Sequence, residues 1–168
     1  MTQWLARAVQ DVEGNPETVY ALFSRAARQG GPGARATLLR SLVKVLPNPM
    51  EALGRLYWQG DAGERLEILE TLPDLDLGPA ALPLVRDALR ANDPRLVAAA
   101  LGPYGSAWLD DHAFRQGVLK CVFMSVPLAT VEGLDRRLDA ELRRMLADYV
   151  AERRAAGRPL PSDVLERL

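Results

Sequence analysis

The 168-residue chain contains one cysteine and one histidine. Cys121 therefore cannot form an internal disulfide, and its place in an apolar segment indicates a packing role in a reduced compartment. With His112 as the single histidine, a multi-histidine metal site is excluded. A Cys–His nucleophilic pair would need the two side chains in contact. Nine residues along one helix point them about 180° apart, so this pair is excluded as well.

Long hydrophobic runs and a strong net charge are also missing. No stretch reaches the ~18 uninterrupted apolar residues that span a bilayer, and residues 1–14 lack the basic-then-apolar pattern of a secretion signal. We therefore expect a cytoplasmic protein with no direct membrane span. The 21 basic and 22 acidic residues give a net charge of −1, which disfavours nucleic acid as a partner. No familiar catalytic motif is present, so we expect no catalytic residues, no metal and no cofactor.

Helical periodicity is the main pattern that is present. Apolar residues recur at a spacing typical of amphipathic helices, and no stretch alternates apolar with polar for long. The pattern predicts an all-α fold in a single domain. We predict N-terminal helices in residues 1–47, two repeat-like helix pairs in 48–109, a central buried helix in 110–128 and a long C-terminal capping helix in 133–157.

A repeat of 30 to 33 residues runs through the first two thirds of the chain. Pro16, Pro49 and Pro79 each stand at the start of a predicted helix, and Asp61 and Asp93 each precede another. Helix pairs repeated at this period are typical of helical solenoids. We therefore predict a right-handed HEAT-like α-solenoid, with an irregular helical bundle of antiparallel helix pairs as the alternative.

The helix predicted in residues 110–127 is apolar on two opposite faces. Phe114 and Val118 lie on one face of a 3.6-residue wheel, and Leu119 and Phe123 lie on the other. A helix of this kind is usually enclosed on both sides. The pattern predicts that it lies at the centre of the structure.

Polar residues on this helix and in the preceding repeat are the candidate binding residues: Asn92, Arg95, Tyr104, Arg115, Gln116 and Lys120. Burying charge is costly unless the charge is paired. These side chains therefore either form structural ion pairs with Asp93, Asp110 or Asp111, or line a pocket for an anionic or polar ligand. The pocket hypothesis predicts that Arg115→Ala or Lys120→Ala removes function and leaves the thermal midpoint nearly unchanged.

The C-terminal helix carries many arginines, which raises the possibility of a DNA-binding groove like that of the HEAT-like alkylpurine glycosylases. Acidic residues are interleaved with these arginines, and pairs such as Arg137 with Glu141 and Arg144 with Asp148 have i, i+4 spacing. A solvated face of mixed charge is therefore favoured over a continuous basic surface.

Two segments carry a resemblance to a known family: NDPRLVAAALGPY (92–104) and RQGVLKCVFMSVPL (115–128). They resemble the EboA family of small helical proteins, encoded in a bacterial gene cluster that some algae also have. The segment GDAGERLEILETLP and the pattern ML-DY-ERRAAGR extend the likeness over roughly residues 55 to 160. The resemblance implies a role in moving a secondary-metabolite precursor out of the cytoplasm. Its expected partners are products of the same cluster, which look like a prenyltransferase, a metal-dependent hydrolase and sugar-metabolism enzymes.

Three functions follow from these patterns. The first is a non-catalytic adaptor or carrier in metabolite traffic, acting with cluster products or a small metabolite. The second is a small-molecule-binding protein or enzyme that uses a polar pocket around Arg115 and Lys120. The third is a nucleic-acid-binding module, which the charge pattern disfavours.

Overall fold

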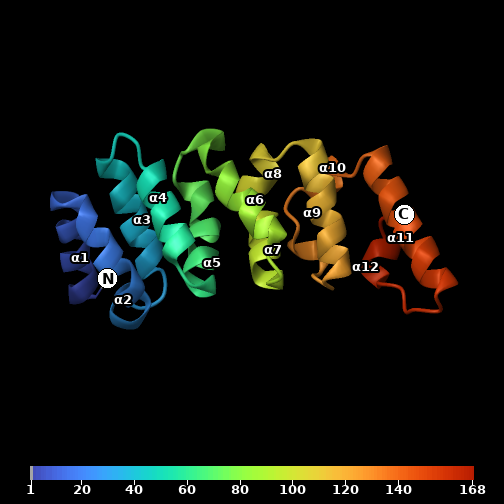
Figure 1. Ribbon diagram of the computed structural model, residues 1–168, viewed down its shortest axis with the longest axis horizontal. Coiled ribbons are helices and arrows are strands. Elements are labelled where there is room, and N and C mark those ends of the chain that lie inside the picture. The colour runs from blue at the N-terminus through green and yellow to red at the C-terminus, as the bar shows by residue number, and fades with distance from the viewer. Residues whose placement is uncertain (1) are drawn as a thin grey trace. The chain divides into compact units, whose positions relative to one another are not determined.

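The computed structural model describes residues 2–168, and its regular structure is helical (Figure 1). These residues form twelve α-helices, α1–α12, and four short 3-10 helices, η1–η4, with no β-strand among them. The predicted all-α class is therefore confirmed. None of the helices in this described part is both long and apolar enough to cross a membrane.

The internal contacts divide the chain into two compact units, Met1–Leu84 and Val85–Leu168. The boundary falls inside α6. Unit 1 contains α1 (Gln3–Gly14), η1 (Pro16–Thr18), α2 (Val19–Gln29), α3 (Ala34–Val45), α4 (Met50–Gln59), α5 (Ala62–Thr71), η2 (Leu72–Asp74), η3 (Gly78–Ala81) and the start of α6 (Leu82–Arg90).

Helix α3 lies at the centre of unit 1, where it packs against α1, α2 and α5. Its inward leucines Leu38, Leu39 and Leu42 are fully buried, as their helical spacing predicts. Arg35 on the same helix is also buried. Its Nη1 donates to Oε1 of Glu67 at 2.6 Å, which compensates the buried charge.

Helix starts follow the predicted capping residues. The Asp61 side chain accepts from the backbone N–H of Glu64 at 2.8 Å, and the Glu64 side chain accepts from the backbone N–H of Asp61 at 3.0 Å, which completes a capping box at the start of α5. Asp93 caps α7 with a single bond, in which its side chain accepts from the backbone N–H of Arg95 at 2.9 Å. Pro79 lies in a 3-10 turn, and α6 itself begins at Leu82.

Unit 2 contains the rest of α6, a set of further helices and one 3-10 turn. Helix α8 was not expected, because Pro103 and Gly105 are weak helix formers. Gly105 is required there, since an added Cβ would lie 1.8 Å from the carbonyl oxygen of Ala100. The elements are α7 (Pro94–Ala100), α8 (Pro103–Trp108), α9 (Asp111–Phe123), η4 (Leu128–Thr130), α10 (Leu134–Arg137), α11 (Ala140–Ala155) and α12 (Ser162–Leu165).

Helix α9 has one buried face instead of the two that its sequence predicts. The buried residues are Phe114, Gly117, Val118, Cys121 and Val122. On the opposite face Phe123 is 65% exposed and Leu119 is only partly buried. The interpretation of this helix as enclosed on both sides is therefore wrong for the second face, which borders an open groove.

The long C-terminal helix predicted in residues 133–157 is two helices. Leu138 leaves helical geometry, with φ −79° and ψ 78°, between α10 and α11. Asp139 then caps α11, and its Oδ1 accepts from the backbone N–H of Leu142 at 2.8 Å. The same carboxylate also binds Arg115 of α9. Capping and this long-range ion pair together favour the break, which apolar periodicity does not reveal.

Candidate functional site

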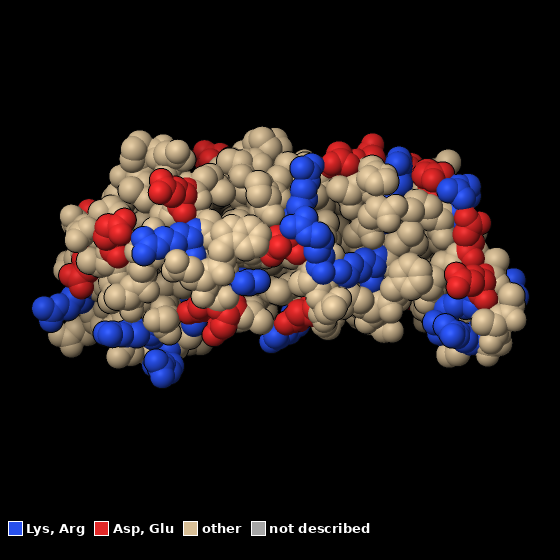
Figure 2. Space-filling model, in the orientation of Figure 1, with Lys and Arg blue, Asp and Glu red and all other residues tan. Residues whose placement is uncertain are grey.

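An open groove of about 490 Å³ lies within unit 2 between α6 and the exposed face of α9; we call it the α6–α9 groove. Figure 2 shows Lys and Arg side chains gathered where Figure 1 places these two helices. The polar side chains that line the groove are Arg86, Arg90, His112, Gln116 and Lys120. No carboxylate of the described residues lines it, so its charged groups there are all hydrogen-bond donors.

Gly117 sets how closely the helices around the groove approach each other. A Cβ built on Gly117 would lie 2.9 Å from Cδ2 of Leu101 and 3.1 Å from Cδ2 of Leu89. Leu89 belongs to α6, and Leu101 directly follows α7. A larger residue at this point would push α9 away from the leucines that form its support.

The cations of the groove differ in how they are paired. Nη2 of Arg86 donates to Oδ2 of Asp110 at 3.1 Å, and Nη2 of Arg90 donates to Oδ1 of Asp87 at 3.3 Å. Both arginine side chains are more than half exposed, so these pairs contribute little to stability. Lys120 forms no ion pair within the described residues. The groove therefore carries one uncompensated positive charge.

Asp110 has two structural tasks beside the groove. Its Oδ1 accepts from the backbone N–H of Ala113 at 2.8 Å, which caps α9, and its Oδ2 accepts from Arg86. The Ala113 N–H and then Arg86 hold the pKa of Asp110 below its usual range. This carboxylate stays ionised and fixes Arg86 at the start of α9.

The apolar part of the groove is formed by Leu89, Ala113, Leu119 and Phe123. The Phe123 ring is in edge-on contact with the Tyr149 ring, with 5.2 Å between the ring centroids. A fixed and largely exposed aromatic ring next to unpaired cationic charge is suited to binding a small molecule.

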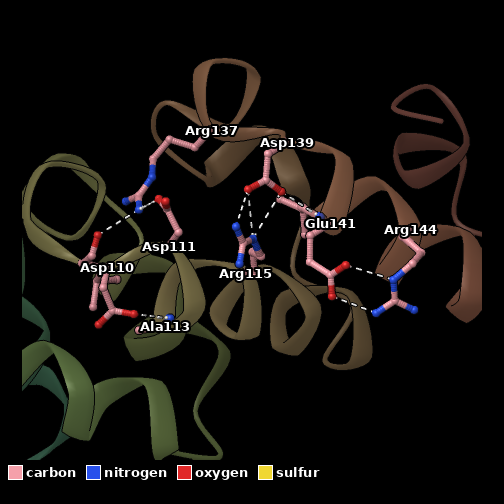
Figure 3. A network of polar contacts seen from close by, with 10 residues as sticks. Asp110, Asp111, Ala113, Arg115, Arg137, Asp139, Glu141 and Arg144 are labelled. Carbon is pink, nitrogen blue, oxygen red and sulfur yellow. Dashed lines mark hydrogen bonds and ion pairs between the residues drawn. The ribbon is translucent and has the colours of Figure 1, made fainter.

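The neighbouring face of α9 is built differently, as Figure 3 shows. Nε of Arg115 donates to Oδ2 of Asp139 at 3.0 Å, and Arg137 donates to Oδ1 of Asp111 at 2.8 Å. Arg115 and the Leu142 N–H hold the pKa of Asp139 below its usual range. This face is a network of ion pairs that joins α9 to the segments before and within α11.

The structure brings together only two of the six predicted site residues. Gln116 and Lys120 line the α6–α9 groove, whereas Arg115 pairs with Asp139 on the other face. The remaining three lie outside this groove: Asn92 is exposed, Arg95 is bound to Asp93 at 2.7 Å, and Tyr104 is buried.

Sequence reasoning missed Arg86 and Arg90, which complete the groove. They lie four residues apart on α6 and therefore on one helix face, and this spacing is a usable signal. What the sequence does not give is that this face lies beside α9. His112 is exposed at the start of α9 and lines the groove.

The structure also keeps His112 and Cys121 apart. Cys121 is fully buried, and burial raises the pKa of its thiol to about 11. Residues 2–168 contain no group of three or more His, Cys, Asp or Glu side chains placed to hold a metal ion.

A second open hollow, of about 500 Å³, lies within unit 1 beside the turn at residues 31–33. Three carboxylates line it, and Arg40 within it already pairs with Asp74 at 2.6 Å. None of the predicted site residues lies there. The α6–α9 groove is therefore the better candidate site.

The arginines of the C-terminal segment are mostly paired with nearby acceptors. Arg144 donates to Glu141 and Asp148, both at 2.7 Å, which confirms the predicted pair with Asp148. Arg137 binds Asp111 instead of the predicted Glu141. Acidic partners on the same helix confirm the face of mixed charge predicted for this region.

These features define an all-α protein with a small cationic and apolar groove between two helices. The family model described as metabolite traffic protein EboA matches residues 33–168, so the chain belongs to the EboA family. The match begins earlier than the likeness expected from residue 55. No curated protein matches the chain, and no solved structure does.

Proposed function

We propose that this chain is a non-catalytic helper in metabolite traffic that holds a small molecule in the α6–α9 groove. The family description supports a metabolite-related role. The observation that carries the proposal is the exposed Phe123 ring, which lies in an open groove of about 490 Å³ next to Lys120. A pocket with apolar walls and a few convergent polar groups is the usual form of a small-molecule site.

The cellular setting in this proposal rests on the family. A helper of this kind would act in the cytoplasm on a secondary-metabolite precursor bound for export, beside products of the same gene cluster. The predicted HEAT-like stacking of helix pairs supports such a role, because stacked helices offer an extended surface to a partner.

A neutral fluorescent probe, N-phenyl-1-naphthylamine, tests the groove directly. We expect it to bind the wild-type protein, and we expect Phe123→Ala to weaken binding roughly fivefold, as for loss of one aromatic contact. Trp58→Ala is the matched control, because Trp58 is a half-exposed aromatic residue in unit 1. Equal affinity in wild type and Phe123→Ala would show that the groove does not hold small apolar molecules.

The helper role has a separate test in the native host. Wild-type protein and Phe123→Ala are purified in parallel, and their small molecules are extracted and compared by mass spectrometry. We expect a compound that accompanies the wild type alone and is recovered unchanged after incubation with the protein. Its conversion into a product would contradict the non-catalytic role.

A further inference from the structure

We infer that the ligand of the α6–α9 groove is an amphipathic anion, with an acidic group at the cations and an aromatic or aliphatic body against Leu119 and Phe123. This inference rests on the proposed function and adds the chemical class of the ligand. Carboxylate, sulfonate and phosphate groups share the chemistry that it requires.

The direction of the two helices fixes how the groove is laid out. Arg86 pairs with Asp110 at the start of α9, and Leu89 lies against Gly117 further along it. Helices α6 and α9 therefore run in the same direction along the groove. Arg90, one residue beyond Leu89, lines the same groove as Lys120 of the later part of α9.

The charge of the groove selects the sign of the ligand. Three cationic side chains line it without a carboxylate, and the two acidic partners, Asp87 and Asp110, balance only the two arginines. Lys120 is left without an ion pair within the described residues. An anion gains charge-assisted hydrogen bonds here, whereas a cation meets like charge.

The apolar stripe selects the body of the ligand. Leu119 and Phe123 follow each other at helical spacing along α9, about 6 Å apart along the helix axis. Such a stripe accommodates a ring system or a short chain, whereas inorganic phosphate would leave it uncovered. The cations and the ring therefore indicate one ligand with two chemically different parts.

Two matched probes separate this inference from the proposed function. N-phenyl-1-naphthylamine is neutral, and 8-anilinonaphthalene-1-sulfonate has the same ring system with a sulfonate added. We expect the wild type to bind the sulfonate probe more tightly by roughly fivefold, the ratio for one exposed ion pair. The preference should fall as salt concentration rises.

The chain offers a matched control, because Lys44 and Lys120 are its only lysines. Lys44 is a highly exposed residue of unit 1, 3.7 Å from Glu13. We expect Lys120→Gln to remove the preference for the sulfonate probe and Lys44→Gln to keep it. Both substitutions replace a surface lysine, so neither should prevent folding.

The outcomes that overturn the inference differ from those that overturn the proposed function. If Phe123→Ala weakens both probes but the wild type binds them equally, the groove holds small molecules and the anionic class is wrong. A preference that survives in Lys120→Gln also overturns the inference. If neither probe responds to Phe123→Ala, the proposed function fails and the inference fails with it.

Discussion

Two faces of helix α9 show how neighbouring cations on one helix come to have different tasks. Arg115 donates to both carboxylate oxygens of Asp139 and is only 23% exposed, so its interactions are internal to the protein. Lys120, five residues further along, forms no ion pair within the described residues and lines an open groove. The comparison shows that an internal partner, more than the type of charge, decides whether a cation on this helix is available to a ligand.

The largest expected effect is a difference in stability between alanine variants of the two phenylalanines of α9. Phe114 is 1% exposed and lies 4.1 Å from the Arg137 guanidinium, measured to the ring centroid, whereas Phe123 is 65% exposed. We expect Phe114→Ala to lower the free energy of unfolding by ~3–5 kcal/mol. For Phe123→Ala we expect a loss of about 1 kcal/mol or less, because its edge-on contact with Tyr149 is the main interaction removed. Urea unfolding of both variants measures this, and similar losses would mean that both faces are buried.

A substitution at Gly117 tests the contact that supports the groove. Leucine there would overlap Leu89 and Leu101, and overpacking of this kind costs ~1–3 kcal/mol. We expect Gly117→Leu to lower the thermal midpoint and to weaken both fluorescent probes, because α9 must move. An unchanged midpoint together with unchanged probe affinity would show that α9 can move away without cost.

A smaller effect distinguishes Arg115 from Lys120. We expect Arg115→Gln to lower the thermal midpoint by a few degrees and to leave probe binding unchanged. Lys120→Gln should leave the midpoint unchanged and weaken binding of the sulfonate probe. The pocket hypothesis predicted that substitution of either residue removes function and leaves the thermal midpoint nearly unchanged. The ion pair of Arg115 with Asp139 changes this prediction for Arg115. Loss of probe binding in Arg115→Gln with an unchanged midpoint would show that Arg115 takes part in binding.

The effect of Arg115→Gln on the thermal midpoint should depend on pH. The Asp139 pKa is lowered in the folded protein, mainly by Arg115. Its pairing therefore adds stability above the ordinary aspartate pKa, and this stability is lost as the pH falls through the lowered value. The difference in midpoint between wild type and Arg115→Gln should shrink in acid. A difference that grows on acidification would contradict the pairing.

The smallest expected signal comes from Cys121 on the buried face. Burial raises the pKa of its thiol to about 11, so almost no thiolate is present at neutral pH. A thiol reagent should label the native protein very slowly and the urea-unfolded protein quickly. Rapid labelling of native protein would show that the buried face of α9 opens readily.

The sequence predicted the helices of this protein better than their surroundings. Apolar spacing gave the all-α class, and local capping chemistry gave Asp61 and Asp93, because a capping side chain acts on backbone groups two or three residues away. The break at Leu138 was missed, since it depends on Asp139 meeting Arg115, a residue 24 positions earlier.

The same limit explains the partial prediction of the site. Gln116 and Lys120 were found because they are polar residues on an otherwise apolar helix. Arg115 fits the same description, and only the folded structure shows its carboxylate partner. Arg86 and Arg90 were missed because nothing in the sequence brings α6 beside α9.

The Asp139 side chain connects α9 to the first turn of α11. One carboxylate both starts α11 and clamps Arg115, so α9 cannot slide along α11 without releasing the first turn of that helix. Occupancy of the groove on the other side of α9 would be transmitted to α11 through this residue or through Phe123, whose ring lies edge-on to Tyr149 of α11.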